Sequence, residues 1–198
     1  MTRPRAGSAV RPALFAFLLG LGVLTGACAR DRRDSGCIEA DAGAPIDPAL
    51  LAFLSRARAA HHAADAHEAK NDPAAAMKEL EAVVNGALPP RSDAPEVREV
   101  LADSLARLAE LGARRGDFAG AEKSIERGLG LVPRASYFRG HLVEVRGLVE
   151  EQRSKALAAA GDADGAARAR ERALAAFQEA MQIQNAVIER AAPAASAD

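Results

Sequence analysis

A cluster of potential metal ligands lies in the segment AHHAADAHEAK, residues 60–70. His61, Asp65 and Glu68 are spaced four and three residues apart, so one helix face would carry all three side chains. Imidazole and carboxylate groups are ligands that zinc and other divalent metals use. A complete site would need ligands from a second helix, and the sequence offers no evident set. We therefore expect a solvated polar face with no bound metal or cofactor.

The residues that support catalysis in known enzymes are not arranged in motifs here. There is no glycine-rich phosphate loop and no HExxH helix. Four serines in the helical region also lie outside any nucleophile motif: Ser104, Ser124, Ser136 and Ser154. Arg115-Gly116-Asp117 spells a cell-adhesion tripeptide, but its position between two helical patterns explains it as a turn. We predict that the protein is not an enzyme.

The two cysteines, Cys28 and Cys37, follow an apolar segment. Residues 1–12 contain three arginines and no acidic residue, and residues 13–27 are uncharged and rich in leucine and phenylalanine. A basic region followed by a short apolar region is typical of a secretory signal peptide. The uncharged run from 13 to 29 has 17 residues, the lower limit for a membrane-spanning helix, and its glycines favour cleavage over permanent insertion.

The residues before Cys28 resemble the lipobox of bacterial lipoproteins. Leu24-Thr25-Gly26-Ala27 places small residues directly before the cysteine, although an aliphatic residue is commoner than Thr25 at its position. The resemblance implies that the signal peptide, residues 1–27, is removed and that the Cys28 sulfur and the new amino terminus are acylated. Two or more acyl chains anchor a protein stably in membrane lipid. The folded part would then face the periplasm, and Ala29 favours the outer membrane, because Asp there usually retains such proteins at the inner membrane.

Other fates of this segment remain open. Ala27-Cys28-Ala29 also fits an ordinary signal cleavage site, and the apolar run could persist as an uncleaved anchor. An unmodified Cys28 could form a disulfide with Cys37. If Cys28 is acylated, Cys37 is a lone cysteine that could stay a free thiol or pair between molecules.

The composition after residue 27 excludes one class of partner. Removing the three arginines of the signal leaves 23 basic residues against 27 acidic ones, and aromatic residues make up only 4% of the chain. Without a basic face or stacking aromatics, nucleic-acid binding is not expected. Residues 28–46 contain charges of both signs and no apolar period, which predicts a flexible tether.

Helical periodicity dominates from Asp47 onward and predicts one all-α domain over residues 47–190. Asp47-Pro48 is a helix start signal, and Pro89-Pro90 is expected to stop a second helix whose apolar stripe ends at Leu88. The six predicted helices cover about 48–70, 73–88, 95–115, 118–131, 136–160 and 163–190. The tail, residues 191–198, is expected to be disordered.

The predicted turns between helices recur at a fixed interval. Asn71-Asp72, Gly116-Asp117 and Gly161-Asp162 are each 45 residues apart. A period of this size is the signature of a helical repeat array, in which each helix pair buries its apolar face against the next pair.

The middle unit, residues 102–133, resembles a tetratricopeptide repeat (TPR), on these residues: Leu105, Leu108, Ala109, Ala121, Ile125, Gly128 and Pro133. The resemblance implies three antiparallel helix pairs stacked as a short TPR-like α-solenoid. The period exceeds the usual 34 residues by 11, about three helical turns, so we expect longer first helices rather than long loops. HEAT-like pairs or a plain helical bundle remain alternatives.

The third unit departs from the pattern, because Glu150, Arg153 and Arg170 occupy positions that should be apolar. Two interpretations are open. Either the register of this unit has slipped, or the unit is a terminal cap with a polar face.

The TPR resemblance implies a partner-binding groove lined by the first helix of each pair. The first unit contributes Arg58, His61, His62, Asp65 and Glu68. The second contributes Asp103, Arg107, Glu110 and Arg114, and the third Glu151, Gln152 and Lys155. Ordinary solvent exposure of these residues is the alternative interpretation. Their mixed charges favour a polar peptide or another protein over an apolar ligand.

The leading hypothesis is a membrane-anchored, periplasmic scaffold for protein–protein interaction, for example an accessory to an envelope assembly. One alternative is a periplasmic metal-binding or small-ligand-binding protein that uses the histidine face. Another is a homo-oligomeric structural lipoprotein joined through helix stripes or Cys37. The sequence leaves the oligomeric state open.

Overall fold

The computed structural model describes residues 47–192, and over that range the chain is all-α. The predicted signal peptide, Cys28 and the tether lie outside the described residues, as do residues 193–198 of the predicted tail. Six helices and no strand fill the described range: α1 (Pro48–Ala69), α2 (Pro73–Val84), α3 (Pro95–Arg114), α4 (Phe118–Leu131), α5 (Tyr137–Ala159) and α6 (Ala163–Ala191). The predicted fold class is therefore confirmed at the level of secondary structure.

The three turns predicted to repeat have one backbone geometry. Asn71, Gly116 and Gly161 each adopt a left-handed conformation, with φ values of 58°, 81° and 85°. In each turn the next residue, an aspartate, donates its backbone N–H over 2.9 Å to a carbonyl five residues earlier. This is the bond that closes a helix C-terminus when a left-handed residue follows it.

The same aspartates begin the following helices. The side chains of Asp72, Asp117 and Asp162 accept hydrogen bonds of 3.0, 2.9 and 2.8 Å from the backbone N–H three residues later. Such caps satisfy N–H groups that have no partner within the helix. The 45-residue period in the sequence is thus a repeat of structure as well.

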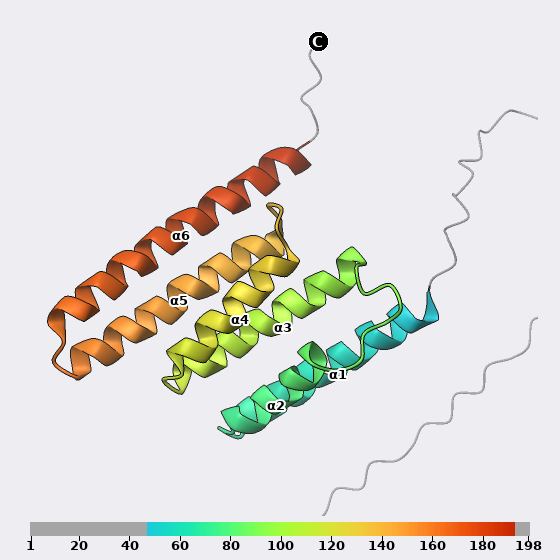
Figure 1. Ribbon diagram of the computed structural model, residues 1–198, viewed down its shortest axis with the longest axis horizontal. Helices are drawn as coiled ribbons and strands as arrows, with labels where there is room; N and C mark the ends of the chain where they lie inside the picture. The colour runs from blue at the N-terminus through green and yellow to red at the C-terminus, as the bar shows by residue number, and fades with distance from the viewer. Residues whose placement is uncertain (1–46, 193–198) are drawn as a thin grey trace, which may run out of the picture. The chain divides into compact units, whose positions relative to one another are not determined.

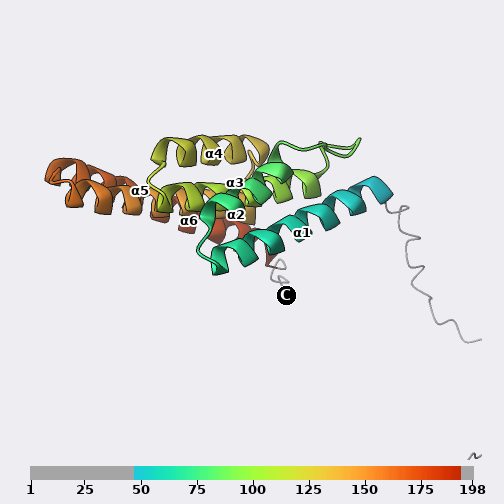
Figure 2. The same ribbon diagram turned by 90° about the horizontal axis from the view of Figure 1, so that it is seen from below.

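Consecutive helices form antiparallel pairs, α1 with α2, α3 with α4, and α5 with α6 (Figure 1). Helix α3 also contacts α1, α2 and α5, and α4 contacts α5. In Figure 2, α4 and α1 lie on opposite sides of α3. The central pair therefore connects the other two.

The apolar core runs through all three pairs but changes in character along the chain. Large side chains such as Leu80 and Leu105 fill the cluster shared by α1, α2 and α3. Ile125 and Leu142 lie in the cluster shared by α3, α4 and α5. The α5–α6 interface contains a smaller cluster in which alanines predominate. The last pair therefore buries less apolar volume than the others.

Helix lengths follow the expectation drawn from the 45-residue period. Helices α1, α3 and α5 contain 22, 20 and 23 residues, whereas α2 and α4 contain 12 and 14. Residues 85–94 form a longer connection than was expected, and α6 extends over 29 residues. The longer first helices account for most of the added period.

The prediction that α2 continues to Leu88 is wrong. The helix ends at Val84, and Leu88 is 43% exposed. The physical reason is local, because Asn85 caps the helix and is followed by Gly86, and both residue types favour a helix end. The Arg127 guanidinium of α4 also donates to the Val84 carbonyl and, over 2.9 Å, to the Asn85 side-chain oxygen. This distant side chain supplies partners at the helix end that periodicity along the sequence does not reveal.

The third helix pair keeps the register of the second. Ser154 and Ala166 are buried, as are Ala109 and Ala121, which lie 45 residues earlier. Glu150 occupies the position of Leu105 and is itself buried, with Arg153 and Arg172 3.5 and 2.7 Å from its carboxylate. Arg170, the other polar substitution in the pattern, is exposed. The slipped register is therefore wrong, and the interior of the third pair contains a buried, ion-paired glutamate among small apolar side chains.

Candidate functional site

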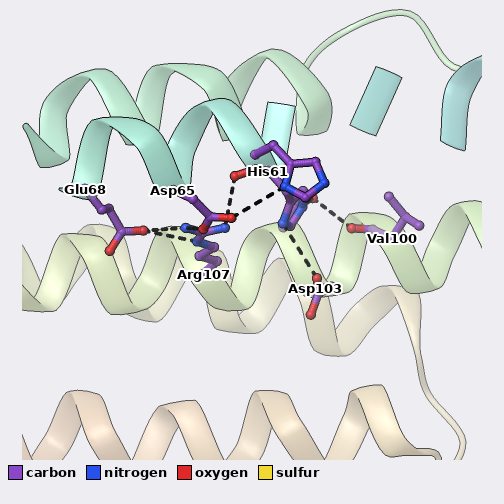
Figure 3. Close-up of polar contacts among 8 residues, drawn as sticks. His61, Asp65, Glu68, Val100, Asp103 and Arg107 are labelled. Atoms are coloured by element: carbon purple, nitrogen blue, oxygen red, sulfur yellow. Dashed lines mark hydrogen bonds and ion pairs between the residues drawn. The ribbon is translucent and has the colours of Figure 1, made fainter. Parts of the chain in front are cut away.

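Arg107 of α3 joins α1 to α3 at the centre of the predicted groove (Figure 3). Its Nη2 donates to Glu68 Oε1 over 2.6 Å and also to Asp65, and its Nη1 donates to the His61 carbonyl over 3.3 Å. Arg114, two turns further along α3, donates to the second carboxylate oxygen of Glu68. The Glu68 carboxylate thus bridges two arginines, and the network holds two neighbouring helices together.

The three side chains considered as metal ligands already have other partners. The Asp65 and Glu68 carboxylates bind Arg107, and the His61 ring lies against Ser104. Over residues 47–192, no group of three or more His, Cys, Asp or Glu side chains is placed to hold a metal ion. A cation entering here would have to displace Arg107, so the geometry favours a structural role for the histidine face.

A histidine, a serine and an aspartate lie close together at His61, Ser104 and Asp103, as in a hydrolase triad. Their hydrogen bonds run in a different direction from those of a catalytic triad. The buried Ser104 hydroxyl donates to the Val100 carbonyl over 2.9 Å, so its single proton is already used. His61 Nε2 lies 2.8 Å from Ser104 Oγ and must therefore donate to it. In a catalytic triad the imidazole accepts the serine proton at that nitrogen. The arrangement is a chain of hydrogen bonds from His61 through Ser104 to the Val100 carbonyl, in which the serine itself is fully buried.

The opposite ring nitrogen makes His61 sensitive to pH. Burial lowers the pKa of His61, the nearby Arg107 lowers it further, and Asp103 opposes the shift. Nδ1 lies 3.9 Å from the Asp103 carboxylate, so a protonated ring would form an ion pair with it. The net lowering of the pKa means that neutral imidazole is the native form at neutral pH.

Glu68 shows the opposite balance between burial and charge. Burial alone raises the pKa of Glu68, but hydrogen bonds from Arg107 and Arg114 outweigh it, so the pKa lies below its usual value. Both arginines remain partly exposed, and solvent therefore screens these ion pairs. The pairs set the orientation of α1 against α3 more than they add to overall stability.

A small hollow opens between α3 and α5. It has a volume of about 160 Å³ and is lined by these residues: Glu110, Ala113, Arg114, Leu148 and Gln152. Glu110 makes no hydrogen bond or ion pair within the part of the chain that the structure describes, and burial raises its pKa. Leu148 is 38% exposed and forms part of the apolar wall. The hollow combines an unpaired carboxylate with an apolar surface.

The structure brings most, but not all, of the predicted groove residues together. One network contains His61, Asp65, Glu68, Asp103, Arg107 and Arg114, and the neighbouring hollow contains Glu110 and Gln152. Arg58 makes no hydrogen bond or ion pair with either group. His62 is exposed, with Nδ1 3.9 Å from Asp65, and Glu151 and Lys155 pair with each other over 2.8 Å.

Sequence reasoning missed the apolar wall of the hollow, formed by Ala113 and Leu148. A signal for one of these residues was present, because Leu148 lies 45 residues after the predicted groove residue Asp103. The uncertain register of the third unit hid this correspondence. Ala113 is a buried alanine among many, and no pattern distinguishes it.

Comparisons with protein-family models, with curated proteins and with solved structures found no match to this chain. Across residues 47–192, no helix has both the length and the apolar character needed to cross a membrane. The functional interpretation therefore depends on the sequence and on the geometry of the helix face described above.

Proposed function

We propose that this protein is a non-catalytic interaction scaffold whose three helix pairs form a short TPR-like α-solenoid. In this proposal a protein or peptide partner binds along the face of α1, α3 and α5. The observation that carries the proposal is the repetition of one turn geometry at Asn71, Gly116 and Gly161. Repeated helix pairs that share neighbours in this way produce extended binding surfaces in repeat proteins.

The hollow beside Glu110 supports a particular class of partner. A lysine or arginine side chain could lay its apolar stem against Leu148 and Ala113 and bring its charged group to the Glu110 carboxylate. The nearby Arg114 already donates to Glu68, so it leaves this carboxylate without a hydrogen-bonded partner. The partner would therefore be a polypeptide segment that presents a basic side chain.

The anchoring half of the proposal rests on the sequence before Cys28. We propose that acylated Cys28 tethers the domain to membrane lipid on the periplasmic side of a bacterial envelope, with the outer membrane favoured by Ala29. Residues 28–46 would keep the domain at a distance from the lipid surface. A domain tethered in this way would keep the proposed binding face close to proteins of the membrane.

Partner binding can be tested by placing a photo-crosslinking amino acid at Gln152, which lines the hollow, in the full chain expressed in its host. A discrete adduct is expected from this position and not from exposed Lys123 of α4. Glu110→Lys should abolish the adduct, whereas Glu126→Lys, the same charge change on α4, should leave it intact. Equal adducts from both crosslinker positions, or an adduct that Glu110→Lys leaves unchanged, would contradict the proposed site.

Anchoring can be tested separately with Cys28→Ser and metabolic labelling by palmitate. The parent chain should incorporate the label and sediment with membranes, and the variant should lose both properties. A Cys37→Ser chain is the matched control, since it removes the other thiol and should keep label and membrane association. An unlabelled parent that fractionates like Cys28→Ser would refute the lipid anchor without bearing on the binding face.

A further inference from the structure

Three carboxylates on the α1–α3–α5 face have no lysine or arginine paired with them in the described part of the chain. The acidic seam, as we define it, consists of Asp103 and Glu110 of α3 and Glu144 of α5. Asp103 and Glu144 each lie near a histidine ring, at 3.9 and 3.7 Å, and their side chains are 44% and 54% exposed. Histidine is largely neutral at neutral pH unless its surroundings favour the proton. The seam therefore keeps a net negative charge that a partner can reach.

The spacing of these residues fixes where they lie relative to the hollow. Asp103 and Glu110 are seven residues apart, close to two turns, so they lie about 10.5 Å apart along the same side of α3. On α5, Glu144 lies one turn before Leu148, which lines the hollow together with Glu110. Helices α3 and α5 run in the same direction (Figure 1), so Asp103 and Glu144 both lie on the N-terminal side of the hollow.

The two arginines on this side of α3 are held by carboxylates of α1. The Arg107 guanidinium turns toward α1 and binds Asp65 and Glu68 (Figure 3). Arg114, which lines the hollow, donates to the other carboxylate oxygen of Glu68. These ion pairs neutralise the α1 side of the face and leave its negative charge along α3 and α5.

We propose that the partner segment carries two basic side chains about 10 Å apart, one in the hollow at Glu110 and one at the end of the seam where Asp103 and Glu144 lie. An extended polypeptide covers that distance in about three residues. Such a segment complements the charge of the seam, whereas an acidic segment would meet like charge there. The inference rests on the proposed partner-binding function and specifies its partner further.

The second contact can be measured by fluorescence anisotropy with the full chain in detergent. The probes are two labelled glycine–serine peptides, one with two arginines three residues apart and one with a single arginine. Low ionic strength is required, because salt screens exposed ion pairs. The two-arginine peptide should bind the parent about fivefold more tightly than the single-arginine peptide, the gain expected from one favourable exposed ion pair.

Variants then assign each arginine to its end of the seam. Asp103→Asn should remove the advantage of the second arginine, and Glu144→Gln should reduce it. Glu110→Gln should weaken both peptides, because each places an arginine in the hollow. Glu126→Gln is the matched control, since it removes an exposed carboxylate from α4 and should change neither affinity. Circular dichroism should show the same helix content in all variants.

The outcomes separate this inference from the proposed function. A second arginine that gives no advantage, or whose advantage survives Asp103→Asn or is lost equally in Glu126→Gln, would overturn the second contact and leave the hollow as the proposed site. Peptide binding that Glu110→Gln does not weaken would contradict the hollow itself, and the two-point contact with it.

Discussion

The second and third helix pairs share one turn but have different interiors. In the α3–α4 pair Leu105 and Ile125 are both buried. One period later the α5–α6 pair holds buried Glu150 and exposed Arg170. The turns at Gly116 and Gly161 are nevertheless almost identical in backbone conformation. The turn and its cap are therefore kept when a buried glutamate replaces a leucine inside the hairpin.

The third pair compensates for its charged interior in two ways. The Glu150 carboxylate has arginines from both helices within 3.5 Å, and buried charge is tolerated only with such partners. Gly147 allows the Phe177 ring to approach α5 closely, because a Cβ there would lie 2.5 Å from the ring. Close packing of small and aromatic residues replaces the leucines of the second pair.

Moving the charge into the second pair should have the largest effect. Leu105→Glu would bury a carboxylate that has no arginine to pair with. Arg127 occupies the position that Arg172 holds in the third pair, but it already donates to the Val84 carbonyl. We expect a loss of about 3–5 kcal/mol in the free energy of unfolding, measured by urea denaturation. Leu105→Met, which keeps volume and polarity, should cost less than about 1.5 kcal/mol. Similar losses for both variants would show that charge is not the cause.

Removing the charge from the third pair should have the opposite effect. The free energy of unfolding of the double variant Glu150→Leu with Arg153→Leu should be unchanged or higher by up to about 4 kcal/mol. The reason is that a buried ion pair usually stabilises a protein no more than well-packed apolar side chains of similar volume do. Glu150→Leu alone should be less stable than the double variant, because it leaves Arg153 beside an apolar side chain. A double variant that loses more than about 2 kcal/mol in the same urea assay would show that the third pair requires its charges.

The turns should respond equally in the two pairs. Gly116→Ala and Gly161→Ala each force an alanine into a left-handed conformation, at a cost of about 1 kcal/mol. Nothing lies within 4 Å of the added Cβ at either position, so packing should not separate the two effects. Thermal unfolding of the two variants should give matching shifts in midpoint. Unequal shifts would break the equivalence of the two hairpins.

The change in stability on neutralising a glutamate should have opposite signs at half-buried Glu110 and at buried Glu150, and this is the smallest effect expected. Burial raises the pKa of Glu110, so the native state holds its proton more tightly and stability falls as pH rises through the usual pKa of 4.5. Glu110→Gln should therefore raise the free energy of unfolding at pH 7, and the gain should shrink below pH 4.5. Glu150→Gln should lower it at pH 7, because that carboxylate is paired. The same sign for both would contradict the contrast between them.

Much of the helical framework was predictable from local sequence. Proline and aspartate marked helix starts, and five helices end within a residue or two of the predicted positions. The end of α2 was predicted too late because the apolar stripe through Leu88 was given more weight than the stop signal Asn85-Gly86, and the contact from Arg127, 43 residues beyond Val84, was not predictable. In the candidate site, the residue types were identified from spacing, but the pairing of Arg107 with Asp65 and Glu68 was not.

The sequence by itself determined the helices, the caps and the repeated turn, because these depend on residues within a few positions of one another. Tertiary structure decided which charges are buried and which are paired. Glu150 and Glu110 illustrate the reason, since both are glutamates in first helices, yet of these two only Glu150 forms ion pairs with two arginines. Burial and ion pairing depend on atoms that the fold brings together from distant parts of the chain.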